Sequence, residues 1–305
     1  MSVKNFLIQR LTYFNRLNRK NQVINGILMH NQFDDKGVIN VHGIDLRNAG
    51  DFYCGPHHYF EQLKGRELDI SGYKDTDQKV LDHYHDLIVN NSLIIGGGGL
   101  LNRPSFNKPI KMIEELSHRG KKTVLWGLGH NEKDKSTYGK VTSYNIDPSK
   151  FGLVGVRDYN MGQEWVPCAS CLHPIMDTKL KIENEVGLIY HKKTLKNKRI
   201  LNSLKDYPST SNTTSIEEII NFIAKSDTIV TDSYHAMYWS MLLDKKVVAL
   251  PNSSKFYSFK YQPTFSDFDN FKNDIKKAQQ HTGILEECRE INLKFAEKAF
   301  DYLGI

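Results

Sequence analysis

Long apolar runs and cysteines are both scarce in this sequence, and each scarcity argues against a class of protein. No apolar run approaches the roughly 20 residues that a membrane-spanning helix needs. The start of the chain shows no secretory signal pattern, so none is expected. Four cysteines in 305 residues are too few for a disulfide framework. We therefore expect a cytoplasmic protein.

The sequence also has no fingerprint of an RNA- or DNA-binding module. Its formal net charge of +6 is a modest excess, which suits anionic small molecules or an anionic lipid surface as well as nucleic acid. Because no recognition motif accompanies the charge, we do not expect nucleic acid as a partner. Hydrophobic residues make up 39% of the chain and charged residues 25%, so a large core is expected.

Residues 1–20 combine basic and apolar side chains and contain no acidic one. The apolar residues have the spacing of one helix face: Phe6, Leu7, Leu11, Phe14 and Leu17. Two interpretations stay open. The segment is either a packed first helix with a solvated basic side, or a peripheral helix on the inner face of an anionic membrane.

The clearest structural signal is an α/β unit between Ser215 and Pro251. It reads as a helix over 215–224, a buried strand from Thr228, a helix over 236–243 and a strand over 247–251. This is the repeating unit of a parallel sheet. In such sheets a ligand binds beyond the carboxyl ends of the strands, where helix N-termini point their free N–H groups. Asp232, Ser233 and His235 lie at that edge, and a bound anion explains them better than the fold does.

Another α/β series precedes this unit. Its predicted helices are residues 51–63 and 111–119, and its predicted strands are residues 86–95, 122–127 and 152–157. A strand over 185–190 opens the series that ends near Pro251. Pro174 to Glu183 reads as a linker, and the chain is helical and charged from Asp269 onwards. We expect two Rossmann-like domains, residues 1–175 and 176–305, that face each other across a cleft. The C-terminal helix can pack back on the first domain.

Glycine-rich segments end two of the predicted strands. Gly96, Gly97, Gly98 and Gly99 let a backbone approach a ligand closely and offer N–H groups to an anion, although a purely conformational role is the alternative. Their spacing matches neither a dinucleotide fingerprint nor a phosphate-binding P-loop. His130 follows the second segment and becomes a candidate ligand contact because it reaches the same edge.

Two polar residues could carry chemistry in the first half. Asp51, in Asn48-Ala-Gly-Asp51, precedes a helical pattern and is either its N-cap or, with a raised pKa, a general base. Arg157 ends another strand, where an arginine grips a carboxylate or phosphate bidentately, or else pairs with Asp158.

Cys168 and Cys171, followed by His173, form one C-x-x-C pair without a second pair, which is incomplete for a structural zinc site. We expect a loop lining the cleft there and no metal. His57 and His58 are expected to pack rather than to catalyse.

The order and spacing of five short motifs resemble the polysaccharide pyruvyl transferase family over about residues 40 to 255. The motifs are Asn48-Ala-Gly-Asp51, Gly96–Gly99, Trp126-Gly-Leu-Gly129, Val156-Arg-Asp158 and Asp232-Ser-Tyr-His-Ala236. The resemblance implies a two-domain fold like that of GT-B glycosyltransferases. It also implies transfer of a pyruvyl group from phosphoenolpyruvate onto a sugar diol as a ketal, in cell-wall or exopolysaccharide synthesis.

Phosphoenolpyruvate carries a carboxylate and a phosphate, so its site should contain an arginine and N–H donors, and ketal formation needs an acid and a base. On this hypothesis His235 is the acid or anion ligand, Arg157 the clamp and Asp51 the base. The expected donor-binding residues are Gly96 to Gly99, Ser233, Asp232, His130 and Asn48. No cofactor is expected besides the donor, and the acceptor is a glycan or a lipid-linked saccharide.

This sequence departs from the family at Ser233, where many members carry an arginine two positions before the motif histidine. Either Arg157 and a nearby lysine supply the missing charge, or the donor differs. One alternative function is therefore a GT-B-type glycosyltransferase that holds a nucleotide sugar, with Ser233 contacting its phosphate. Another is a non-catalytic partner in polysaccharide assembly, which would bind neither donor.

Overall fold

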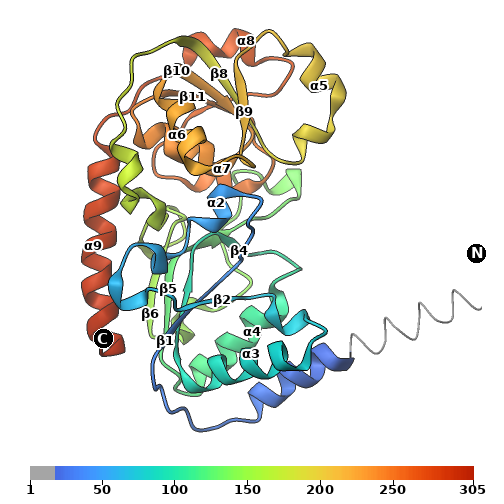
Figure 1. Ribbon diagram of the computed structural model, residues 1–305, viewed down its shortest axis with the longest axis vertical. Helices are drawn as coiled ribbons and strands as arrows, with labels where there is room; N and C mark the ends of the chain where they lie inside the picture. The colour runs from blue at the N-terminus through green and yellow to red at the C-terminus, as the bar shows by residue number, and fades with distance from the viewer. Residues whose placement is uncertain (1–17) are drawn as a thin grey trace, which may run out of the picture.

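The computed structural model describes residues 18–305. They form two parallel β-sheets that follow one another along the chain, with helices on their faces (Figure 1). The predicted parallel α/β class is thereby confirmed. The basic helix predicted within residues 1–20 lies largely outside the described residues, which begin in a helix that ends at residue 28. Within residues 18–305, no helix is both long and apolar enough to cross a membrane.

The first sheet has the strand order β2-β1-β3-β5-β6-β7, and β4 pairs with β5. The strands are β1 (Val38–His42), β2 (Glu67–Asp69), β3 (Ser92–Gly96), β4 (Gly99–Leu101), β5 (Thr123–His130), β6 (Leu153–Val156) and β7 (Glu164–Trp165). Every pair is parallel. The carboxyl ends of these strands therefore meet at one edge of the sheet, and the loops that follow them gather there.

Helices cover both faces of the first sheet. On one face, α3 (Gln78–Asn90) and α4 (Asn107–His118) pack against β-strand side chains such as Leu125. On the other face lies α9 (Ile284–Leu303), which follows the second sheet in sequence and returns to the first (Figure 1). Its Phe295 packs against Val124 and Trp126, and its Asn292 accepts a hydrogen bond from Trp126 Nε1 at 3.0 Å. The C-terminal helix thus completes the core of the first sheet.

The second sheet has the order β12-β11-β10-β8-β9, again with parallel pairs. Its strands are β8 (Asn184–Tyr190), β9 (Ser209–Ser211), β10 (Ser226–Thr231), β11 (Lys246–Ala249) and β12 (Thr264–Phe265). Its helices are α5 (Lys198–Ser203), α6 (Ile216–Ala224), α7 (Tyr234–Leu242) and α8 (Phe271–Asp274). The Ser215 hydroxyl accepts a bond from Glu218 N and so caps α6 at the predicted place.

Two element predictions in the first half were wrong. The segment predicted as a strand over 86–95 is helical up to Asn90, and β3 begins only at Ser92. The reason is that Tyr84 and Ile88 lie four residues apart on the buried face of α3, so its helical period continues through the apolar run. Strands β1 and β2 had no sequence prediction.

The helix predicted over 51–63 is broken into α2 (Ala49–Phe52) and two 3₁₀ turns, η1 (Pro56–His58) and η2 (Glu61–Leu63). Pro56 interrupts it, because a proline cannot donate its nitrogen to a continuing helix. Asn48 occupies the N-cap position of α2, and Asp51 lies within the first turn instead of capping it. The chain after Asp269 likewise forms only short turns and α8 before α9 begins.

The packing of α9 can be tested with two substitutions on the same helix. Phe295 is fully buried, so Phe295→Ala should lower the free energy of unfolding by about 3–5 kcal/mol through the cavity it leaves. Leu293 is 51% exposed, and Leu293→Ala should change stability by no more than about 0.5 kcal/mol. Urea denaturation measures both. Equal losses would mean that α9 does not rest on the sheet through this face.

Candidate active site

Helix α2 brings the first half of the chain into contact with the start of α7. The Asn48 Oδ1 atom accepts a bond from Asn212 Nδ2 at 3.0 Å, and Ala49 N donates to Asn212 O at 3.1 Å. A Cβ atom at Gly50 would lie 2.2 Å from His235 Nδ1, so only glycine allows this approach. The carboxyl-edge loops of both sheets therefore share one site.

His235 lies in the first turn of α7 and is buried. Its Nδ1 is 4.0 Å from Asp51 Oδ1, and its Nε2 is 3.7 Å from Cys168 Sγ. Burial, and then the positive charges of Arg157 and Lys255, hold the pKa of His235 well below its ordinary value. The ring is therefore neutral at neutral pH, and in this state it can accept a proton but cannot serve as a strong acid.

Arg157 follows β6 and is 1% exposed. None of its three guanidinium nitrogens has a hydrogen-bond partner within residues 18–305. The guanidinium packs on the ring of Tyr234 at 4.4 Å, and a Cβ at Gly99 or Gly129 would come within 2.9 Å or 2.7 Å of it. Asp158 does not pair with it: one Asp158 oxygen accepts bonds from His130 N and Tyr144 OH, and the other is buried without a partner in the same described range.

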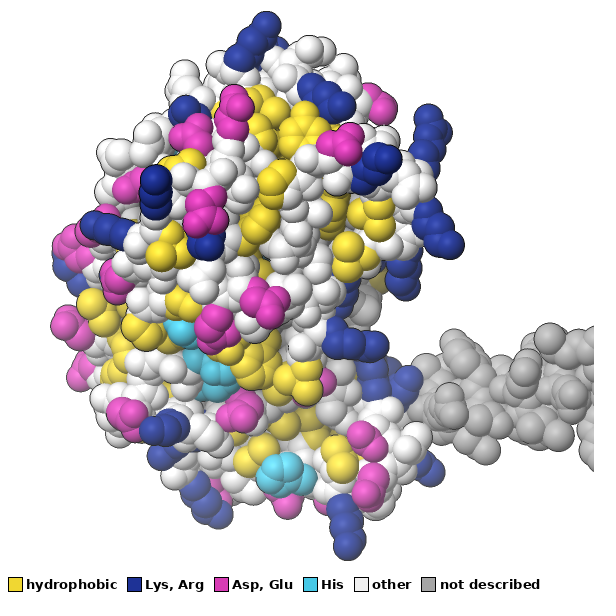
Figure 2. Space-filling model, turned by 45° about the horizontal axis from the view of Figure 1, so that its top comes forward, with side chains coloured by type: hydrophobic (Ala, Val, Ile, Leu, Met, Phe, Trp, Pro, Cys, Tyr) yellow, Lys and Arg dark blue, Asp and Glu magenta, His cyan; other side chains and the backbone are white. Residues whose placement is uncertain are grey.

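Lys255 lies beside Arg157, and Lys133 lies close to Lys255. Lys255 lies in η9 (Ser254–Ser258), and burial, followed by the charges of Arg157 and Lys133, lowers its pKa well below the ordinary value. Lys133, after β5, has a pKa lowered to about 8 by burial, then by Lys193 and Arg103. Figure 2 shows several Lys and Arg side chains close together on the right-hand side of the molecule. An anion would relieve the repulsion between Lys255 and the two cations Arg157 and Lys133.

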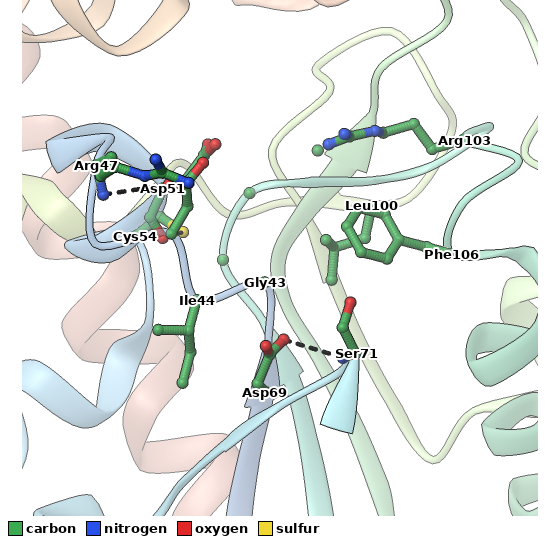
Figure 3. Close-up of a pocket in the computed structure, with 14 residues that line it drawn as sticks. Gly43, Ile44, Arg47, Asp51, Cys54, Asp69, Ser71, Leu100, Arg103 and Phe106 are labelled. Atoms are coloured by element: carbon green, nitrogen blue, oxygen red, sulfur yellow. Dashed lines mark hydrogen bonds between the residues drawn. The ribbon is translucent and has the colours of Figure 1, made fainter. Parts of the chain in front are cut away.

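A pocket of about 310 Å³ adjoins these cations at the edge of the first sheet (Figure 3). Carboxylates line it, with an aromatic ring and two arginines: Asp45, Asp51, Asp69, Phe106, Arg47 and Arg103. Burial raises the pKa of Asp69, which accepts a bond from Ser71 N at 2.9 Å. Asn48 Nδ2 donates to Asp51 Oδ2 at 2.6 Å and thereby fixes the second oxygen of that carboxylate.

The glycine run forms the floor of this pocket. Gly97, Gly98 and Gly99 line it, whereas Gly96 is the last residue of β3. Gly97 and Gly98 have φ angles of +85° and +86°, a conformation that favours glycine. A Cβ at Gly97 would lie 2.4 Å from the Cys54 carbonyl oxygen, so the run also lets the α2 loop approach.

A family model described as "Polysaccharide pyruvyl transferase" matches residues 44–254, which is more than half of the chain. The chain belongs to the polysaccharide pyruvyl transferase family. It is therefore a transferase of polysaccharide biosynthesis. No curated protein matches the sequence. The matched segment includes α2, the glycine run, Arg157 and His235, and it ends one residue before Lys255.

The structure places the predicted site residues of this transferase in different settings. Asp51, Arg157, His235 and the glycine run come together around the pocket and the cation cluster. Ser233 is the N-cap of α7, and its hydroxyl makes no capping bond. Asn48 contacts Asp51 and not the pocket. For these residues a donor-binding role stays a prediction.

Two other predicted contacts have their polar atoms occupied. The ring nitrogens of His130 lie 2.9 Å from the hydroxyls of Ser254 and Ser258, so His130 links β5 to η9. The Asp232 carboxylate accepts bonds from His191 N at 2.6 Å and Thr194 Oγ1 at 2.5 Å, which fixes the loop after β8. In this structure both ring nitrogens of His130 and both carboxylate oxygens of Asp232 already have protein partners.

The cysteine pair lies in the core. Cys168 and Cys171 are buried free thiols at η6 (Ala169–Leu172), and Cys171 accepts a bond from Asn292 of α9. Cys168 contacts His235, but neither cysteine lines the pocket. Within residues 18–305, no group of His, Cys, Asp and Glu is arranged to hold a metal ion.

Sequence reasoning missed the cations Lys133 and Lys255. Each lies in a loop after a strand, without a motif around it, and their convergence depends on how the two sheets are placed. The one sequence signal was the positive net charge. Pocket residues Asp45 and Asp69 were missed as well, because β1 and β2 were not predicted.

Buried histidines beside α2 predict an acid-sensitive stability. Burial and the neighbouring His58 and His42 lower the pKa of His57 from 6.5 to about 3. The unfolded chain thus binds more protons below pH 6.5, and stability should fall as the pH drops from about 6.5 towards 4. At pH 4.5, His57→Gln should recover about 2–3 kcal/mol of this loss. The exposed His118→Gln should not.

Denaturant unfolding of the three proteins at pH 7 and pH 4.5 measures these differences. A His57→Gln variant with the same pH dependence as the His118→Gln control would contradict a neutral, buried His57.

Proposed function

We propose that this transferase moves the pyruvyl group of phosphoenolpyruvate onto two hydroxyls of one sugar, forming a cyclic ketal. The observation that carries the proposal is the buried guanidinium of Arg157, which has no hydrogen-bond partner within residues 18–305 and lies among further cations. A ligand with two anionic groups would pair with this cluster. Membership of the pyruvyl transferase family supports the same donor.

The donor's carboxylate and phosphate are proposed to lie between Arg157, the glycine run and the start of α7. Arginine binds either group through two parallel N–H bonds. The first N–H groups of α7 (Tyr234–Leu242) have no partners within the helix and favour negative charge. The hydroxyl of Ser233, which makes no capping bond, can add one further donor.

The sugar acceptor is proposed to occupy the pocket of about 310 Å³. Carboxylates such as Asp45 and Asp69 accept hydrogen bonds from sugar hydroxyls, and the ring of Phe106 offers an apolar face for a sugar ring. Asp51 lies in this pocket and 4.0 Å from His235, so it adjoins both proposed subsites. Two domains of GT-B type, residues 1–175 and 176–305, would then meet at this cleft.

The proposed reaction proceeds in two additions at C2 of the donor. One sugar hydroxyl adds to C2 while C3 takes up a proton. Inorganic phosphate then leaves, and the second hydroxyl closes the ketal at C2. Asp51 is the proposed base: it takes the proton of the first hydroxyl and passes it to the departing phosphate. It then takes the proton of the second hydroxyl and returns it to His235, 4.0 Å away, which has given its own proton to C3. His235 is neutral in the free protein, so it acts as the acid only after the donor's negative charge has raised its pKa.

Ligand-dependent thermal unfolding tests the donor. Phosphoenolpyruvate at a hundred times its dissociation constant should stabilise the fold by about 2.7 kcal/mol, a shift of several degrees. Arg157→Ala should abolish the shift. Arg119→Ala, which removes a surface ion pair with Glu115, should preserve it. A shift with nucleotide sugars alone would instead establish a glycosyltransferase, and no shift with either donor would favour a non-catalytic assembly partner.

Phosphate release during turnover tests His235. His235→Ala should lower kcat at least about tenfold, the usual contribution of a positioned acid. His281→Ala is the matched control and should leave kcat unchanged, because the His281 ring packs against Tyr261. Near-normal turnover of His235→Ala would remove this histidine from the mechanism.

A further inference from the structure

One aromatic ring brings together two cations from different sheets. The Arg157 guanidinium, at the end of β6, lies 4.4 Å from the centre of the Tyr234 ring, and Lys255 Nζ lies 5.3 Å from the same centre. Tyr234 is the first residue of α7 and directly follows Ser233. Helix α7 contains no lysine or arginine, so the second cation beside the Tyr234 ring comes from η9.

The segment that carries Lys255 is held on both sides by hydrogen bonds. Ser254 N donates to Glu132 O at 3.0 Å, and the hydroxyls of Ser254 and Ser258 contact the ring of His130 at 2.9 Å. These bonds tie η9 to the end of β5. The position of Lys255 beside Arg157 is thus built into the fold, as a binding residue requires.

Positive charge exceeds negative charge around Lys255. The charged groups that face it are Arg157 after β6, Lys133 after β5, Arg103 after β4 and Asp51 in α2. The ammonium makes no hydrogen bond or ion pair within the part of the chain that the structure describes, and Asp51 is the one carboxylate in that group. Two neighbouring cations that lack a shared counter-ion predict an anion between them.

We propose that Lys255 binds an anionic group of the donor opposite Arg157, so that the donor is held by one cation from each sheet. This inference rests on the proposed function, since it assigns a second binding residue to the same site. Lys255 would thereby supply the positive charge that an arginine carries in many family members at the position of Ser233.

The proposal predicts opposite effects on binding and on stability. Without ligand, Lys255 repels Arg157, Lys133 and Arg103, so Lys255→Met should unfold at a temperature equal to or above that of the wild type. Its affinity for phosphoenolpyruvate should fall by about tenfold or more, the usual effect of losing a charged hydrogen bond. A residue with a purely structural role would lower stability and leave the affinity unchanged.

Titration calorimetry of the full chain with phosphoenolpyruvate gives the affinities. Lys255→Arg keeps the charge and should bind within about threefold of the wild type. Lys246→Met is the matched control, because Lys246 forms an ion pair with Asp227 away from this cluster, and it should bind like the wild type.

Each outcome has one meaning. Wild-type binding that persists in Lys255→Met would overturn the role of Lys255 and leave the proposed function intact. Binding of a nucleotide sugar but not phosphoenolpyruvate, again lost in Lys255→Met, would support Lys255 as the anion ligand and overturn the pyruvyl donor. A wild type that binds neither of them, nor inorganic phosphate, would overturn both.

Discussion

Arg157 carries a buried positive charge, and no hydrogen-bonding partner within residues 18–305 stabilises it. A buried charge of this kind is costly, and the cost rises when other cations lie nearby. Much of the surrounding structure serves to tolerate it: Gly99 and Gly129 leave room for the guanidinium, and Tyr234 offers the face of its ring. A site that is electrostatically incomplete when empty gains most when an anion arrives, which is the condition for tight and selective binding.

The geometry of this site depends on contacts between the two sheets. Asn48 meets Asn212, Gly50 makes room for His235, and His130 is held by the hydroxyls of η9. Lys192, after β8, also forms an ion pair with Asp45 of the pocket. Each of these contacts joins a part of the chain at the first sheet to a part at the second. A small shift between the sheets would therefore separate His235, Asp51 and the cations together, and so these residues depend on one another for their placement.

The sequence was sufficient to predict the parallel α/β class and the segments that end at the site. This was possible from β8 to β11 because apolar strands alternate there with a capped helix, as at Ser215. The prediction was wrong where the apolar run of α3 passes into β3, because a buried helix and a buried strand show the same composition. Asp51, Arg157 and His235, which the structure brings together, could be selected from the sequence because each follows or precedes a recognisable turn. Lys133 and Lys255 could not be selected, because only the three-dimensional arrangement of the loops brings Lys255 to Arg157 and Lys133 to Lys255.

Helix α9 has a consequence for the synthesis of the chain. A ribosome adds about 5–20 residues per second, and domains fold from the N-terminus as they emerge. The strands of the first sheet are all made by Trp165, yet Val124 and Trp126, which Phe60 and Leu63 cover in part, also need residues of α9 as cover. For a time on the order of ten seconds, the nascent chain presents an apolar sheet face that its own later segment must cover. During that interval chaperones or neighbouring chains can bind the apolar surface that α9 will later cover.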